Sequence, residues 1–160
     1  FTGLLGRFFV FSDKIIMKEK ILQLIHERQW QNVYVNDVSI KEWLGDHFPS
    51  FDTIETIPEI DLAITECTIL IARTGTIVLR SDMPAGRALP VYAPVHIVIA
   101  NADQLVYDLK ESINKIMLEG KDQLPSSLVF ASGPSRTGDI EKTLVVGVHG
   151  PREVFVFMLN

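Results

Sequence analysis

Short continuous apolar runs alternate with amphipathic stretches along this chain of 160 residues. The clearest runs lie at 33–35, 62–64 and 96–100, and none of them alternates regularly with polar residues. Such runs are typical of strands buried on both faces, and the stretches between them have helical periodicity. The pattern therefore predicts an α/β fold whose sheet is covered on both faces. No repeat or linker divides residues 1–160, so we expect one domain.

Both ends of the chain also carry apolar runs. Residues 8–11 predict a first buried strand, and residues 154–159 predict a last buried strand. Residues 1–12 lack the basic segment and cleavage site of a signal peptide. Because residue 1 is phenylalanine rather than methionine, a truncated N-terminal region is one expectation.

Capping residues mark the expected helices. Asp13 is placed to cap a helix that runs to about Arg28. Capping boxes at 39–42 and 101–104 predict a short second helix and a longer helix that ends at Gly120. The apolar face of the first helix is expected to hold Met17, Ile21, Leu24 and Ile25.

Turn residues separate the remaining strands. Residues 69–72 and 76–79 flank an Arg-Thr-Gly turn and predict a hairpin. The proline-rich segment 81–94 predicts a loop, and 128–131 predicts a further strand.

Charge and cysteine content exclude several classes of protein. The formal net charge of −5 argues against a nucleic-acid binder, which needs a clustered basic face. The single cysteine, Cys67, cannot form an internal disulfide, and we expect it to be a small buried apolar residue of a cytoplasmic protein. No apolar run approaches the roughly 18 residues of a membrane helix.

Polar residues follow several predicted strands directly. In open α/β sheets ligands bind beyond the carboxyl ends of the strands. The segments 65–67, 132–139 and 149–152 each follow an apolar run and carry ionisable or hydroxyl groups. These segments are therefore expected to converge on one site.

The densest of these segments is 133–139. Its two glycines would let backbone N–H groups turn inward around an anion. Arg136 offers a planar fork for a carboxylate or phosphate, and Ser135 and Thr137 offer hydroxyl donors. Asp139 would cap the next turn or orient Arg136. The alternative is a turn that an Arg136–Asp139 pair simply fixes.

Several other positions allow either a functional or a purely structural interpretation. Glu66, at a strand end, is either an acid, base or nucleophile with a raised pKa or a solvated turn residue. His149, flanked by small residues, either reaches a ligand or bonds to the backbone. Thr74-Gly75 and Arg87 belong to a ligand site or only to a turn and a loop. His96 is expected to be structural.

Common cofactor and catalytic motifs are absent from the sequence. There is no P-loop, no dinucleotide fingerprint, no H-E-x-x-H and no G-x-S-x-G. The single cysteine cannot supply an iron–sulfur cluster. We therefore expect this chain itself to hold no metal or cofactor.

The C-terminal half resembles the LUD family, the lactate-utilisation proteins of the C-component type. The resemblance rests on G-P-S-R-T-G-D-I-E at 133–141 followed by V-G-V-H-G-P at 146–151. The Thr-Gly-Thr step within 69–79 also fits, as does Gly86-Arg87 followed by 94–98. The match is good over about residues 61–160, whereas before it only the order of strand and helix agrees. The family usually has alanine where this chain has a glycine after Thr137.

The resemblance implies a three-layer α/β/α sandwich with a mostly parallel sheet. Such a fold is like that of the superfamily of ribose-phosphate isomerase, glucosamine-phosphate deaminase and CoA-transferase. The resemblance also implies a part in a system that oxidises L-lactate to pyruvate, with iron–sulfur clusters on partner proteins. Fold analogy alone establishes no chemistry.

Together these points predict a protein that binds a small carboxylate or phosphate. The catalytic candidates are Glu66, His149 and Asp139. The ligand-binding candidates are Thr74, Gly75, Arg87, Gly133, Ser135, Arg136, Thr137, Glu141 and Gly150. The alternatives are a non-catalytic subunit that docks iron–sulfur partners and an isomerase-like or CoA-transferase-like enzyme that uses Glu66. Whether the chain is itself an enzyme stays open, and a homo-oligomer is a further option.

Overall fold

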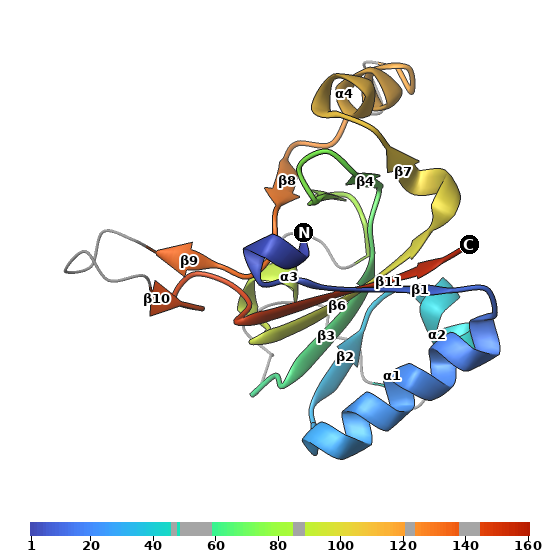
Figure 1. Cartoon of the computed structure of the whole chain (residues 1–160), viewed down its shortest axis with the longest axis vertical. Coiled ribbons are helices and arrows are strands. Elements are labelled where there is room, and N and C mark those ends of the chain that lie inside the picture. The colour runs from blue at the N-terminus through green and yellow to red at the C-terminus, as the bar shows by residue number, and fades with distance from the viewer. Residues whose placement is uncertain (46–47, 49–58, 85–88, 121–123, 138–144) are drawn as a thin grey trace.

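A five-stranded parallel sheet forms the centre of the computed structural model, which describes residues 1–45, 48, 59–84, 89–120, 124–137 and 145–160. Every neighbouring pair of strands in this sheet is parallel. The strands lie in the order β1 (Arg7–Phe11), β11 (Glu153–Leu159), β6 (Val95–Asn101), β3 (Leu62–Glu66) and β2 (Val33–Val35) (Figure 1). The predicted parallel sheet is therefore confirmed.

Two helices, α1 (Lys14–Arg28) and α2 (Val38–Leu44), cover one face of this sheet (Figure 1). The side chain of Asp13 accepts the backbone N–H groups of Ile15 and Ile16, so the predicted cap of α1 is confirmed. On the face of α1 toward the sheet, Met17 and Ile21 are fully buried, while Leu24 and Ile25 are partly buried.

A second, four-stranded sheet covers the other face. Its strands lie in the order β7 (Leu105–Val106), β4 (Ile69–Ile71), β5 (Thr76–Arg80) and β8 (Leu128–Ala131). Strands β4 and β5 form the predicted antiparallel hairpin. Helix α4 (Leu109–Met117) packs on the outside of this sheet through Ile116. The arrangement is consistent with a three-layer α/β sandwich, in which the small sheet and α4 make the third layer.

The shorter elements lie between these layers or at their edges. They are η1 (Thr2–Leu4), α3 (Leu89–Tyr92), η3 (Ala102–Gln104) and the strand pair β9 (Arg136–Thr137) and β10 (Val145–Val146).

The prediction of one long helix from the capping box at 101–104 is wrong. The Gln104 side chain does accept the backbone N–H of Asn101, at 2.6 Å, but the box starts only η3. The next residues leave the helical path because Leu105 and Val106 pair with β4. Asp108 then caps α4 by accepting the N–H of Glu111.

Four further features differ from the predictions. Strand β1 is only half-buried, because it lies at the edge of the main sheet. Helix α2 begins at Val38, after the N-cap Asp37, rather than at Ser39. The predicted loop 81–94 contains the short helix α3, and in the apolar run before His149 only Val145 and Val146 form a strand.

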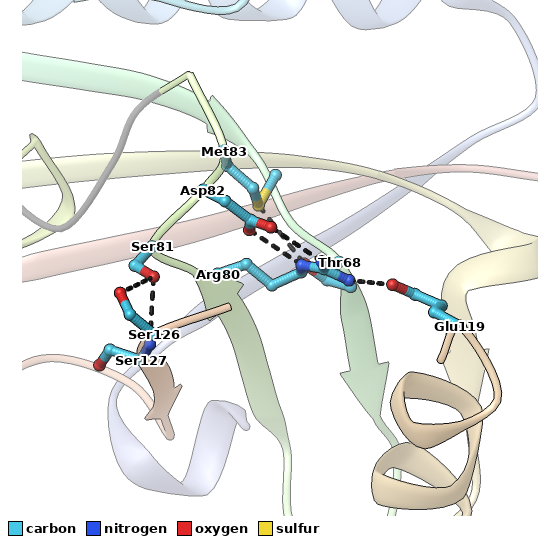
Figure 2. A network of polar contacts seen from close by, with 8 residues as sticks. All are labelled: Thr68, Arg80, Ser81, Asp82, Met83, Glu119, Ser126 and Ser127. Atoms are coloured by element: carbon cyan, nitrogen blue, oxygen red, sulfur yellow. Dashed lines mark hydrogen bonds and ion pairs between the residues drawn. The ribbon is translucent and has the colours of Figure 1, made fainter. Parts of the chain in front are cut away.

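Arg80 ties the small sheet to the end of α4 (Figure 2). Its guanidinium pairs with Asp82 at 2.8 Å and with Glu119. The hydrogen bond from Arg80 holds the pKa of Asp82 below its ordinary value. Beside this pair, the Ser81 hydroxyl accepts the N–H of Ser127 at 3.1 Å. This network holds the end of β5 against the residues that follow α4 and those that precede β8.

Ser112, on the buried side of α4, provides a first prediction. Its hydroxyl is buried and, within the described residues, has no hydrogen-bond partner. An unsatisfied buried polar group costs roughly 1–3 kcal/mol. We expect Ser112→Ala to raise the free energy of unfolding by about 1 kcal/mol in urea titrations. The control is Asn114→Ala on the exposed side of α4, which reports helix propensity alone. A Ser112→Ala gain no larger than the control's would contradict this prediction.

Candidate functional site

A surface cavity of about 420 Å³ lies at the amino edge of the main sheet. Three elements form it: helix α3, the start of β6, and the segment that leads into β11. Its lining residues are Val91, Tyr92, Pro94, Gly147, Val148, His149, Gly150 and Arg152. The cavity therefore includes most of the V-G-V-H-G-P run singled out in the sequence.

Backbone hydrogen bonds fix the rim of this cavity. The N–H of Gly147 donates to the carbonyl of Ser135 at 2.9 Å, and the N–H of Ser135 donates to the carbonyl of Pro151 at 2.8 Å. The N–H of Arg152 donates to the carbonyl of Pro94 at 2.7 Å. The two signature segments thus lie against each other and against the start of β6.

Two glycines allow this close packing. Gly147 has φ +80°, and a Cβ built there would lie 2.0 Å from Cγ of Arg152. A Cβ at Gly150 would lie 3.0 Å from Cβ of Ser135. Any larger residue at Gly147 would displace the Arg152 side chain, and larger residues at Gly150 would crowd Ser135.

The polar groups of the cavity favour a negatively charged ligand. Among the described residues, Arg152 and His149 line it, no acidic side chain does, and Arg152 has no ion pair. The neighbouring Glu153 is already paired with Arg7 and Arg28, each at 3.2 Å.

Backbone donors add to this character. The amides of Val148, His149 and Gly150 donate to no acceptor among the described residues. Backbone N–H groups without a partner in the protein are available to a ligand or to water.

The other signature residues lie next to the cavity. Arg136 and Thr137 form β9, where Arg136 is exposed and pairs with Val146 of β10 without lining the cavity. Gly133 has φ +87° and packs against the carbonyl oxygen of Leu4.

A row of hydroxyl groups connects the turn at Thr74 and Gly75 to Ser132, which directly precedes the 133–141 segment. Thr74 Oγ1 lies 2.7 Å from Thr76 Oγ1, which lies 2.7 Å from Ser132 Oγ. A second, mainly apolar cavity of about 310 Å³ lies beside Gly75 and Thr76, between the two sheets. The Thr-Gly-Thr turn is thus connected to the segment that enters β9.

Glu66 is not brought to this cluster. It ends β3, whereas the cavity lies where β6 and β11 begin. Leu62 shares a register row with Val95 and Glu153, and Glu66 stands four residues further along. At about 3.3 Å per residue, that is roughly 13 Å along the strand.

Glu66 instead faces the start of α2. Its carboxylate accepts the Ser39 hydroxyl at 2.5 Å, and its backbone N–H donates to the Asp37 carboxylate at 3.3 Å. Asp37 is only 2% exposed. Burial raises its pKa to about 6, and the nearby charge of Glu66 adds to the shift.

Two other buried groups are uncharged near neutral pH. Burial raises the pKa of the Cys67 thiol to about 12, so the residue is a buried apolar packer, as expected. Burial lowers the pKa of His96 to about 4, and its Nε2 lies 2.8 Å from Thr65 Oγ1. His96 is therefore a neutral structural residue.

Arg87, Asp139 and Glu141 lie outside the described residues. Sequence reasoning missed Tyr92 and did not choose Arg152 as a ligand residue. Arg152 directly follows the H-G-P run, which was a usable signal. Tyr92 stands in a proline-rich segment whose place beside that run depends on the fold.

Comparison with known proteins settles the family. A model of the LUD domain family matches residues 5–159. The chain belongs to the LUD domain family. The resemblance seen in its signature segments is thereby confirmed and extends to the first strands.

Relatives of this LUD-domain protein include several called lactate utilization protein C. The one from Shouchella clausii is 38% identical over 109 residues, which are 68% of this chain and 48% of that protein. The one from Deinococcus radiodurans is 36% identical over 101 residues, which are 62% and 47% of the two chains. The chain spans about half the length of the curated relatives it matches.

A solved structure supports the fold. The crystal structure of a DUF162 family protein from Deinococcus radiodurans superposes with a TM-score of 0.73 at 20% identity. The match covers 99% of this chain and 91% of that one.

Clusters of metal-ligating side chains and membrane-spanning helices are absent from the described residues. No group of three or more His, Cys, Asp or Glu side chains is placed to hold a metal ion there. No helix in that part of the chain is long and apolar enough to cross a membrane.

Proposed function

We propose that this LUD-domain protein serves lactate utilisation by binding a small organic anion in the cavity at the amino edge of the main sheet. The names of its relatives support the metabolic role. The observation that carries the site is a set of donors at this cavity that have no partner among the described residues: Arg152, His149 and the amides of 148–150.

Each group has a chemical task in this proposal. The Arg152 guanidinium pairs with the anion, and the backbone amides bind its remaining oxygens. His149 acts as the acid or base at the rim. Arg136, on the adjoining β9, serves as an outer cation that draws the anion in.

The oxidation of lactate to pyruvate requires a redox centre. We assign it to iron–sulfur partner proteins, with this chain as the component that presents or senses the organic acid. An enzyme that uses Glu66 would need a separate ligand site near α2, because that carboxylate lies roughly 13 Å along β3 from the cavity rim.

A thermal-shift panel tests the proposal. It contains L-lactate, pyruvate, a sugar phosphate and inorganic phosphate, each with wild type, Arg152→Ala and Arg136→Ala. A ligand at about 100 times its Kd adds roughly 2.7 kcal/mol, or about 5–10 °C in Tm for a chain of this size. We expect a shift in wild type that Arg152→Ala abolishes and Arg136→Ala reduces.

Arg73→Ala is the matched control, because Arg73 is an exposed arginine on the β4–β5 turn, away from the cavity lining. A shift that survives in Arg152→Ala would move the site elsewhere. A flat panel would refute anion binding and leave a subunit that docks partner proteins.

A further inference from the structure

The cavity is larger than a lactate ion requires. Its volume of about 420 Å³ falls within the range of roughly 300–1,000 Å³ that protein pockets offer to drug-sized ligands. L-lactate and pyruvate contain only a few non-hydrogen atoms. A single small carboxylate at Arg152 would leave most of this space unfilled.

The rest of the space is bordered by apolar and aromatic groups. Val91, Tyr92 and Pro94 come from α3 and the residues before β6, whereas the cationic groups come from 147–152. Tyr92 lines the cavity and is 61% exposed, so much of its side chain is accessible to a ligand. Rings prefer offset-stacked partners, and nucleic-acid bases stack well on tyrosine.

The donor set suits an anion with more than two oxygens. Three consecutive amides, of Val148, His149 and Gly150, have no acceptor in the described structure, and Arg152 adds a guanidinium fork. A phosphate group presents three terminal oxygens, whereas a carboxylate presents two. Backbone N–H concavities are a frequent way to hold phosphate.

We infer that the ligand of this cavity is a nucleoside phosphate, with its phosphate on the 148–152 segment and its base against Tyr92. This inference rests on the proposed anion site and adds the class of the ligand. The ribose would span the gap between the two ends. The protein would thus couple an organic-acid system to a nucleotide.

Isothermal titration tests this with four probes: adenosine 5′-monophosphate, adenosine, inorganic phosphate and L-lactate. The proteins are wild type, Tyr92→Ala, Tyr92→Phe and Arg152→Ala. We expect the nucleotide to bind wild type at least tenfold more tightly than phosphate does. Loss of base stacking in Tyr92→Ala is expected to weaken nucleotide binding roughly 5- to 150-fold.

Two comparisons separate a loss of base stacking from a loss of folding. Tyr92→Phe keeps the ring and should bind the nucleotide like wild type. Phosphate affinity should be unchanged in Tyr92→Ala and lost in Arg152→Ala. Both positions are exposed, so equal Tm values without ligand are expected for all four proteins.

The outcomes distinguish this inference from the proposed function. If phosphate or lactate binds in an Arg152-dependent way but the nucleotide binds no more tightly, the anion site stands and the nucleotide inference falls. If the nucleotide binds and Tyr92→Ala has no effect, the inference also falls. If no probe binds, both the inference and the anion site fall.

Discussion

Phe157→Ala is expected to lower the free energy of unfolding by about 3–5 kcal/mol, the cost of deleting a large buried aromatic side chain. Phe157 is 0% exposed and lies on β11, between the first strand and the centre of the sheet. Its ring stacks on Phe11 with 5.4 Å between centroids and contacts Phe9 at 5.1 Å. The substitution removes the side chain that joins these two rings to the core under α1.

Urea unfolding of wild type and variant measures this effect. The matched control is Phe8→Ala, since Phe8 belongs to the same strand pair but is 38% exposed. We expect the control to lose about 1 kcal/mol or a little more, because less apolar area leaves water on folding. A loss below about 1.5 kcal/mol for Phe157→Ala would contradict the packing described for β1 and β11.

The second large effect is a gain. Asp37→Asn is expected to stabilise the protein at pH 7 by about 2–3 kcal/mol. Folding raises the pKa of Asp37 from 3.8 to about 6, and one pKa unit corresponds to about 1.4 kcal/mol. The amide oxygen of asparagine still accepts the N–H of Glu66, and the cost of burying a charge disappears.

The pH dependence gives the sign. Because the pKa is higher in the folded state, the Asp37 contribution favours folding fully below about pH 3.8. That contribution is lost as the pH rises to about 6. The difference between variant and wild type should therefore grow between pH 4 and pH 6 and then level off. The control is Asp103→Asn at an exposed position, which removes the same charge. A variant no more stable than this control at pH 7 would refute the buried charge.

Local signals predicted the elements whose environment is simple. The helix after Asp13 and the strands at 33–35 and 96–100 follow directly from capping and apolar continuity. The small sheet did not follow, because β7 is a pair of residues whose partners lie on β4, far away in the sequence. The same pairing is why a capping box at Asn101 did not start a long helix.

The site was predicted in its parts but not in its position. The 133–137 and 147–151 segments do meet, as their density of glycine, hydroxyl and cationic groups suggested. We expected both segments to follow the carboxyl ends of strands in one parallel sheet. In the structure the first segment follows β8, which belongs to the small sheet, and residues 147–152 precede β11. The same rule predicted that Glu66 lies beside these two segments. In the structure Glu66 is at the carboxyl end of β3, and the segments lie near the amino ends of β6 and β11. Tyr92 could not be predicted as a lining residue, because its place beside residues 147–152 follows from the same strand order.

The pairing of the first and last strands bears on how the molecule forms during synthesis. In the main sheet β11 lies between β1 and β6, and Arg7 is opposite Phe155. Until residues 153–159 have left the ribosome, β1 has no neighbour in the sheet, and the aromatic residues Phe9 and Phe11 lack Phe157. Contacts this distant in sequence form slowly and leave apolar surface open to aggregation meanwhile. The cavity, whose rim runs into β11, can acquire its shape only after residues 153–159 have left the ribosome.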